Sequence, residues 1–244
     1  FKQKTAYEIL SGLVGSEMCI RDSFNSVASK YDIMNDVMSM GVHRYWKELM
    51  IDWLSPHEEM KIIDVAGGTG DISRRFLKRV NGKGKAIVCD PNENMVEAGK
   101  RIKQYSNDIE WVVAPAEELP FEDNTFDAYL VSFGVRNFSD LKKSLQEAKR
   151  VLKPGGRFLC LEFSKVKNES LSKVYNLYSS LIPIFGKVIV GDEEPYKYLT
   201  RTIKEFPSQE EFLEIIKSSD FVTVDYRNIF NGVVAMHSAE KKEL

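Results

Sequence analysis

From Lys61 onward, short apolar runs alternate with longer stretches in which apolar residues recur every three or four positions. The apolar runs predict strands at 61–66, 84–90, 109–113, 126–133 and 156–163. These runs are almost uninterrupted by polar residues, which is typical of strands in a sheet that is covered on both faces. The intervening stretches predict helices at 71–79, 94–104 and 140–151. Because strands joined through helices run parallel, the pattern predicts an α/β fold with a mostly parallel sheet and helices on both faces.

The two ends of this repeat carry further elements. Helical patterns at 26–38 and 44–54 predict a helical cover over residues 24–58. A less regular segment, 164–206, follows the fifth predicted strand, where an open α/β sheet places its ligand crevice, and we interpret it as a lid over a substrate. The remaining predicted elements are a helix at 208–218, strands at 221–226 and 232–238, and a tight turn at Asn231–Gly232. Residues 24–244 are therefore predicted to form one domain.

The first 23 residues fit poorly with this pattern. Their apolar patch, Ile9 to Val14, contains a glycine and is too short for the apolar region of a signal peptide. The string resembles the translated sequencing-adapter sequence found at the ends of assembled contigs. We interpret residues 1–23 as a non-native segment or a disordered tail, and we assign no function to them.

Composition excludes several classes of protein. The net charge of −2 offers neither a basic surface for nucleic acid nor a polybasic membrane anchor. No apolar run reaches the roughly 18 residues that a membrane-spanning helix needs. The cysteines, at 19, 89 and 160, are too scattered for a disulfide framework, and the histidines, at 43, 57 and 237, lack metal-ligand spacing. We expect a cytoplasmic protein with no metal and no nucleic-acid partner.

A glycine-rich loop, in the stretch "KIIDVAGGTGDISRRF" at 61–76, joins the first predicted strand to a helix. A nucleoside-triphosphate loop would place a lysine directly after its last glycine, whereas Asp71 follows Gly70 here. A dinucleotide-binding loop would need its third glycine at a different offset. Because a carboxylate at the start of the helix repels phosphate, the loop favours a ligand without phosphate at this point.

Two acids indicate the ligand. Asp90 ends the second predicted strand and could accept hydrogen bonds from ribose hydroxyls, each worth about 1.5–3 kcal/mol. The same spacing suits NAD, so Asp90 alone does not distinguish the two ligands. Asp64, with Asp71 nearby, could hold an ammonium group, although both acids could instead cap the helix. Together these features favour a nucleoside with a cationic or zwitterionic tail, such as S-adenosylmethionine.

Three stretches, "DVAGGTGD", "CDPNENM" and "APAEELPFEDNTFD", resemble the successive motifs of class I S-adenosylmethionine-dependent methyltransferases. The resemblance implies a Rossmann-like, mostly parallel seven-stranded sheet whose last strand is antiparallel. It also implies a set of cofactor-binding residues: Asp64, Gly67, Gly68, Thr69, Gly70, Asp90, Pro91, Met95, Pro115, Ala116 and Ser132. The backbone of Ala116 would meet the adenine ring, and Met95 or Pro91 would pack near it. Pro115 departs from the polar residue often found there and has no N–H to offer adenine.

Four further stretches narrow the resemblance. "YDIMNDVMSMGVHRYW" (31–46), "SFGVRN" (132–137), "RVLKPGGRFLCLEFS" (150–164) and "PYKYLTRTIKEFP" (195–207) are similar to those of the ubiquinone and menaquinone biosynthesis C-methyltransferases. The resemblance implies methyl transfer to a ring carbon of a polyprenylated benzoquinol or a demethylmenaquinol. It also implies self-association as a homodimer and membership of a complex of quinone-biosynthesis enzymes. The alternative is a class I methyltransferase that acts on another small aromatic or lipid acceptor.

The expected chemistry requires an ionised quinol. A quinol hydroxyl should titrate near pH 10, as tyrosine does, so only about one molecule in a thousand is ionised at neutral pH. Arg136 stays protonated and could stabilise the quinol anion. Two roles are open for it: an electrostatic clamp on the anion, or a base. Asn137 would orient Arg136 or the hydroxyl, His43 could act as a base, and Tyr178 could contact the acceptor from the lid.

The apolar stretch "LIPIFGKVIV", 181–190, has three open interpretations. It could line a tunnel for a prenyl tail, touch a membrane surface peripherally, or pack against the sheet. Rival activities fit less well. A nucleic-acid methyltransferase usually carries an N/D-P-P-Y motif where this chain has "SFGVRN", and an NAD-dependent oxidoreductase is disfavoured by Asp71. An inactive scaffold is disfavoured because the glycines, Asp90 and Arg136 are all present.

Overall fold

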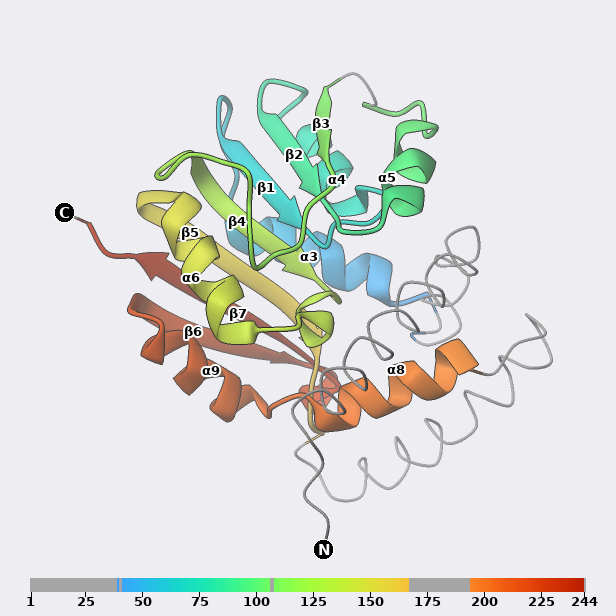
Figure 1. Ribbon diagram of the computed structural model, residues 1–244, viewed down its shortest axis with the longest axis vertical. Helices are drawn as coiled ribbons and strands as arrows, with labels where there is room; N and C mark the ends of the chain where they lie inside the picture. Colours follow the sequence, from blue (N-terminus) through green and yellow to red (C-terminus); the bar gives the residue numbers. More distant parts are fainter. Residues whose placement is uncertain (1–38, 40, 106–107, 167–193, 244) are drawn as a thin grey trace, which may run out of the picture.

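The computed structural model describes residues 39, 41–105, 108–166 and 194–243 (Figure 1). Several expectations lie outside the described residues: the interpretation of residues 1–23, the helix at 26–38, the apolar stretch 181–190 and the role of Tyr178. None of the helices in the described ranges is long and apolar enough to cross a membrane.

One twisted sheet of seven strands organises the domain, in the order β3-β2-β1-β4-β5-β7-β6. The strands are β1 Lys61–Val65, β2 Lys85–Cys89, β3 Ile109–Val112, β4 Phe126–Ser132, β5 Leu152–Phe163, β6 Phe221–Ile229 and β7 Val234–Lys241. Strands β1 to β5 pair in parallel, and β7 is antiparallel to both of its neighbours, β5 and β6. The predicted fold is thus confirmed. The strand order reverses between β1 and β4, and in an open α/β sheet the crevice beyond such a reversal holds the ligand.

Helices cover both faces of the sheet (Figure 1). Helices α3 His43–Leu54, α4 Asp71–Arg79 and α8 Glu194–Glu205 contribute buried side chains to one core, which includes Trp46, Phe76 and Leu199. Helices α6 Leu141–Val151 and α9 Gln209–Ser218 pack into the second core, on the opposite face, around Tyr129 and Phe212. Helix α5 Glu93–Lys100 lies beside β3. Apolar burial on both faces explains why the strand sequences lack alternation.

Local chemistry sets where several helices begin. The side chain of Asp140 accepts a hydrogen bond from the backbone of Lys143 at the start of α6. Ser208 and Glu211 form a reciprocal capping box at the start of α9. Such caps satisfy backbone N–H groups that have no partner within the helix. The predicted starts of these two helices were therefore accurate to within one residue.

Strands β6 and β7 each run three residues beyond their predicted ends, to Ile229 and Lys241. The structure differs more from the predicted elements at three other places. Strand β5 begins at Leu152 rather than 156, because Leu152 pairs with Phe126 before an irregularity in the register. Helix α5 ends at Lys100, four residues before the predicted end at 104. The segment predicted to be irregular contains α8, whose Leu199 and Ile203 are buried. The predicted turn before β7 is confirmed, since both Asn231 and Gly232 have positive φ.

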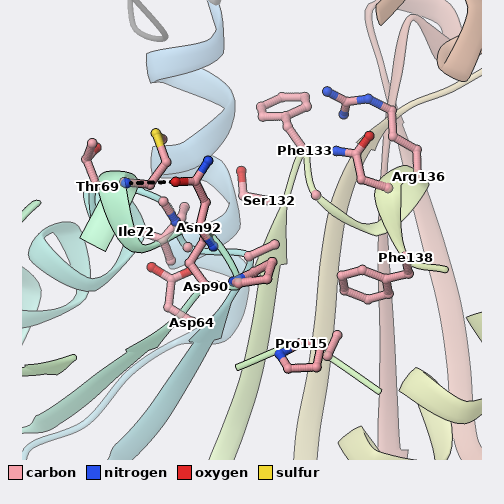
Figure 2. Close-up of a pocket in the computed structure, with 18 of the residues that line it drawn as sticks. Asp64, Thr69, Ile72, Asp90, Asn92, Pro115, Ser132, Phe133, Arg136 and Phe138 are labelled. Atoms are coloured by element: carbon pink, nitrogen blue, oxygen red, sulfur yellow. Dashed lines mark hydrogen bonds between the residues drawn. The ribbon is translucent and has the colours of Figure 1, made fainter. Parts of the chain in front are cut away.

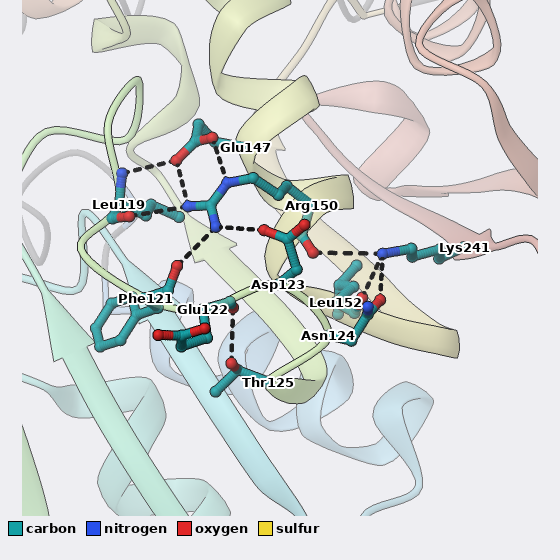
Figure 3. Close-up of polar contacts among 10 residues, drawn as sticks. All are labelled: Leu119, Phe121, Glu122, Asp123, Asn124, Thr125, Glu147, Arg150, Leu152 and Lys241. Carbon is teal, nitrogen blue, oxygen red and sulfur yellow. Dashed lines mark hydrogen bonds and ion pairs between the residues drawn. The ribbon is translucent and has the colours of Figure 1, made fainter.

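Arg150, at the carboxyl end of α6, ties the loop before β4 to the rest of the domain (Figure 3). Its guanidinium donates to the carbonyls of Phe121 and Leu119, at 2.6 and 2.9 Å, and to the carboxylates of Glu147 and Asp123. Glu147 in turn accepts a hydrogen bond from the backbone N–H of Leu119. The Arg150 side chain thus satisfies two carbonyls and one carboxylate of the loop, together with a second carboxylate on its own helix.

Replacing Arg150 with alanine should destabilise the domain. Loss of several charge-assisted hydrogen bonds should lower the free energy of unfolding by about 2–3 kcal/mol. For a chain of this size, that corresponds to a fall in Tm of roughly 4–12 °C in a thermal melt. The control is Arg79→Ala, which removes exposed ion pairs to Glu48 and Asp52 worth about 1 kcal/mol or less. Equal shifts in the two variants would contradict this role for Arg150.

Candidate active site

A cavity of about 610 Å³ opens at the carboxyl ends of the parallel strands. Among the predicted cofactor residues, those that line it are Asp64, Gly67, Gly68, Thr69, Asp90, Pro91, Met95, Pro115, Ala116 and Ser132. Arg136 and Asn137 line the same cavity from the far side of β4. Figure 2 shows Asp64 and Asp90 on one side, Arg136 and Phe138 on the other, and Ser132 between them. The structure therefore brings both predicted groups of residues to one place.

The glycine loop forms the wall beside β1. A Cβ on Gly67 would lie 2.7 Å from the carbonyl oxygen of Asp64 and 2.8 Å from its carboxyl carbon, so only glycine fits there. Gly70 does not line the cavity. It adopts a φ of +79° at the start of α4, and a Cβ there would lie 2.8 Å from the Trp111 ring. Gly70 therefore shapes the turn rather than facing the ligand.

Arg74, in α4, anchors the glycine loop to neighbouring segments of the chain. Its guanidinium donates to the carbonyls of Thr69, Gly99 and Gln104 and lies over the Trp111 ring. This contact links the loop to α5 and to the segment that follows it. Nothing in the local sequence pattern marked Arg74, because its partners are backbone carbonyls up to 30 residues away.

Asp64 is a buried acid with an unused oxygen. One carboxylate oxygen, Oδ2, accepts hydrogen bonds from the backbone N–H and the hydroxyl of Ser73, at 3.1 and 3.0 Å. The other, Oδ1, is buried and has no hydrogen-bond partner among the described residues. Burial raises the pKa of Asp64 to about 7, although the hydrogen bonds from Ser73 act in the opposite direction. Such an oxygen suits a cationic ligand, whose charge would offset the cost of burial.

Asp90 is held at the end of β2 by two backbone N–H groups, those of Gly68 and Asn92, each at 2.9 Å. Burial raises the pKa of Asp90 to about 6, and these hydrogen bonds limit the rise. The side chain of Asn92 caps α5 through its oxygen, while its Nδ2 atom has no partner in the described part of the chain. An acid and an amide donor thus face the cavity together, as a ribose would require.

Asp71 lines the cavity, but its carboxylate is already paired with two positive charges. Its carboxylate pairs with Lys47 and Arg75, each at 2.9 Å. Burial alone would raise the pKa of Asp71, but the two positive charges outweigh it and the pKa lies below the usual value. Asp71 thus lines the cavity with its charge balanced by two cations, and its support of Asp64 in binding a cation stays a prediction. Lys47, which sequence reasoning missed, lines the cavity.

The far side of the cavity carries a buried ion pair. Nη1 of Arg136 lies 2.5 Å from a carboxylate oxygen of Glu162, and the two side chains are 3% and 2% exposed. Arg136 is therefore a buried residue rather than a surface arginine. Asn137 accepts a hydrogen bond at 3.0 Å from the hydroxyl of Tyr198, a cavity residue on α8. Both Glu162 and Tyr198 escaped prediction, although a lone acid in the apolar run "FLCLEF" was a signal.

His43 does not lie among the described residues that line the cavity. Its ring nitrogen Nδ1 is 2.8 Å from the hydroxyl of Ser39, and the side chain is buried at the start of α3. The two other histidines also lie away from the cavity, with His57 at the surface and His237 bonded to the backbone of Gln209. The described residues therefore supply no histidine base at this site.

S-adenosylmethionine, the expected cofactor, fits the part of the cavity that is lined by Asp64, Asp90 and the glycine loop, which we call its first half. The unpartnered oxygen of Asp64 would accept from the ammonium group of its amino-acid tail. Asp90 and the amide of Asn92 would hold the ribose hydroxyls, and Gly67 and Gly68 present backbone alone to the cavity. Met95 and Ala116 would contact the adenine ring. The residues present match the charge and the polarity of this molecule.

Binding of S-adenosylhomocysteine, which carries the same amino-acid tail, should depend on pH through Asp64. An ammonium group needs the ionised carboxylate, so affinity should fall as pH drops below the pKa of about 7, by up to about tenfold per pH unit. Asp64→Asn should bind about 10- to 100-fold more weakly at pH values near 7.5 and show a flatter profile, with a residual slope from Asp90. Calorimetry across this range provides the measurement. Equal affinities of the two proteins near pH 7.5 would contradict the assignment.

Known proteins are similar to this chain over most of its length. The model of the ubiE/COQ5 methyltransferase family matches residues 13–241. A relative from Ruegeria sp. (strain TM1040), named ubiquinone/menaquinone biosynthesis C-methyltransferase UbiE, is 50% identical over 226 residues, covering 91% of this chain and 90% of the relative. The mitochondrial 2-methoxy-6-polyprenyl-1,4-benzoquinol methylase of Bos taurus is 45% identical, covering 89% of this chain and 77% of its own length.

Solved structures share the fold at low sequence identity. An S-adenosylmethionine-dependent methyltransferase from Thermotoga maritima has a TM-score of 0.65 at 17% identity and covers 91% of this chain and 99% of its own. Another, from Aquifex aeolicus, has a TM-score of 0.61 at 20% identity and covers 85% and 98%. The fold is therefore that of class I methyltransferases. With the family match over most of its length, the chain belongs to the ubiE/COQ5 methyltransferase family.

Proposed function

We propose that this protein transfers a methyl group from S-adenosylmethionine to a ring carbon of a polyprenylated quinol. The acceptor is a 2-polyprenyl-6-methoxy-1,4-benzoquinol, a demethylmenaquinol, or both. The names of its relatives support this acceptor class. The observation that carries the proposal is one cavity with two unlike halves, in which acids with unused hydrogen-bonding capacity face a buried arginine.

The first half of the cavity holds the methyl donor. Asp64 and Asp90 fix its amino-acid tail and its ribose, and the glycine loop sets how deeply it enters. When bound there, S-adenosylmethionine supplies an electrophilic methyl group. Because the loop is tied by Arg74 to α5, the donor is held on a rigid wall. Such alignment of two reactants contributes much of the rate of a bimolecular reaction.

The second half of the cavity activates the acceptor. Keeping a quinol neutral at pH 7 withholds about 4 kcal/mol of driving force, because only about one molecule in a thousand is ionised. Arg136 presents a positive charge from a buried position, where charge interactions are stronger than in water. Asn137, held by Tyr198, orients the quinol oxygen. Phe133 and Phe138 provide apolar surfaces for the ring.

Further expectations accompany this function. We expect a cytoplasmic protein with at most peripheral contact with the membrane in which its acceptor dissolves. Self-association as a homodimer and membership of a quinone-biosynthesis complex stay predictions. The roles assigned to Tyr178, to the apolar stretch 181–190 and to residues 164–206 as a lid also stay predictions, since much of that segment lies outside the described residues.

Methylation assays test the proposal and the role of Arg136. The protein, S-adenosylmethionine and reduced demethylated quinols of both ring types should give products with one added methyl group on carbon, detected by mass spectrometry. Arg136→Lys keeps a charge beside Glu162 but loses the planar fork, and we expect kcat to fall about 100-fold with little change in donor affinity. Arg79→Lys, far from the cavity, is the control. Tight donor binding with neither quinol methylated would instead favour another small aromatic or lipid acceptor.

Tyr198→Phe should lower kcat by about threefold to tenfold, the value of one hydrogen bond. The substitution removes the hydroxyl that donates to Asn137 but keeps the ring, so the amide loses its fixed orientation. Tyr226→Phe is a matched control, because its hydroxyl bonds to Glu210 at the surface. Steady-state kinetics on the preferred quinol provide the measurement. Unchanged turnover in Tyr198→Phe would show that Asn137 needs no such support.

A further inference from the structure

Lys47, on α3, is a buried cation beside the glycine loop. Its side chain is 8% exposed, and it lines the cavity together with Asp64 and Gly67. Its ammonium group donates a hydrogen bond to Oδ2 of Asp71 at 2.9 Å. Lysine is rarely buried unless its charge is paired, because removing an ammonium group from water is costly. The place of this lysine in the cavity wall therefore needs a reason.

The pair with Asp71 uses only part of the hydrogen-bonding capacity of Lys47. A lysine ammonium group carries three N–H donors. Within the described part of the chain, Asp71 accepts one of these hydrogen bonds, and no second acceptor is bonded to Nζ. Asp71 is itself shared, since its other carboxylate oxygen accepts from Arg75 at 2.9 Å. Lys47 therefore has donors available for a group that enters the cavity.

Asp64 offers the opposite charge on the same wall of the cavity. Burial raises the pKa of its carboxyl group, and the positive charge of Lys47 acts in the opposite direction. The two side chains do not satisfy one another, because Oδ2 of Asp64 accepts from Ser73 and Oδ1 has no partner among the described residues. The wall thus presents a carboxylate oxygen without a partner and an ammonium group with unused donors.

We propose that Lys47 binds the carboxylate of the amino-acid tail of the methyl donor, while Asp64 binds the ammonium group of the same tail. This inference rests on the proposed function, but only on its methyl-donor half. An α-amino acid carries both charges on one carbon atom, so its binding site needs a cation and an anion close together. Lys47 then bonds to two carboxylates, that of Asp71 and that of the ligand, and holds the tail at a second point.

The other cation of the cavity is placed for a different group. Among the described lining residues, the positively charged side chains are those of Lys47 and Arg136. Arg136 is paired with Glu162, and Figure 2 shows it on the side of the cavity opposite Asp64. A tail whose ammonium group is bound at Asp64 is therefore directed toward Lys47 rather than toward Arg136.

Charge balance at this wall favours a zwitterionic tail. Lys47 and Arg75 carry positive charges, and Asp71 and the ionised form of Asp64 carry an equal negative charge. An amino-acid tail adds one charge of each sign, so the wall stays neutral when the tail binds. A tail that carried an ammonium group alone would leave an excess positive charge in a partly desolvated site. Lys47 thereby distinguishes an amino-acid tail from a simple amine.

A comparison of two ligands on each variant isolates this contact. S-adenosylhomocysteine carries the amino-acid tail, and its decarboxylated analogue keeps the ammonium group but has hydrogen in place of the carboxylate. By calorimetry near pH 7.5, the parent protein should bind the first ligand about 10- to 100-fold more tightly than the second. Lys47→Met keeps the length of the side chain without its charge and should reduce this ratio to about threefold or less. Damage to the glycine loop would weaken both ligands alike and would leave the ratio unchanged.

Two variants serve as controls. Lys47→Arg keeps the positive charge and should retain most of the ratio, whereas Lys83→Met removes an exposed lysine that pairs with Glu58 at the surface and should leave the ratio unchanged. Equal ratios in the parent protein and Lys47→Met would overturn the inference while leaving the donor site in place. A ratio near one in the parent protein would overturn it as well. If the parent protein did not bind S-adenosylhomocysteine at all, the donor half of the proposed function would fail and this inference with it, which is a distinct result.

Asp71→Asn covers the case in which Lys47→Met does not fold, as judged by thermal melts. The amide removes the negative charge that competes with the ligand for the Lys47 ammonium group. Lys47 should then pair more strongly with the carboxylate of the tail, and the ratio of the two affinities should rise about threefold to tenfold above that of the parent protein. A ratio that stayed level or fell would contradict the binding of the tail carboxylate by Lys47.

Discussion

Burial of carboxylates at the carboxyl edge of the sheet is the constraint on which the rest of this structure depends. Asp64 on β1, Asp90 after β2 and Glu162 on β5 are all 7% exposed or less. Burial raises the pKa of each one. Each acid is retained because something offsets part of the cost: a serine, two backbone N–H groups, or an arginine. The reversal of strand order between β1 and β4 places Asp64, Asp90 and Arg136 around one cavity.

The two halves of the cavity solve this problem differently. On the donor side, Asp64 keeps one oxygen without a partner, so that the remaining cost is offset only when a cation arrives. On the acceptor side, Glu162 already has its counter-charge in Arg136. The first arrangement favours a cationic ligand, whereas the second is an ion pair that is complete without a ligand. Neither half of the cavity stabilises the fold in proportion to the number of its polar contacts. The cost of removing the charged groups from water opposes the gain from each contact.

The parts of this site that could be predicted from sequence are those set by backbone geometry. Gly67 and Asp90 sit at a junction of strand and helix whose pattern is local, so their roles followed from neighbouring residues. Arg136 was identified from its place after β4, but its partner comes from a strand 26 residues later. The pairing of Asp71 with Lys47 was missed for the same reason, since Lys47 lies on a helix that precedes β1. Pairs formed across the fold have no local signature, whereas turns and strand ends do.

The charge balance of the cavity links the two halves into one reaction. With the donor bound at Asp64, the sulfonium side adds a positive charge close to a region that is otherwise neutral, because Arg136 and Glu162 cancel one another. An ionised quinol beside Arg136 would be an anion that faces this positive charge. The two then attract across a cavity with low polarity, where Coulomb energies are several times larger than in water. Methyl transfer removes both charges together, so an arrangement that is costly before the reaction is relieved by the reaction itself.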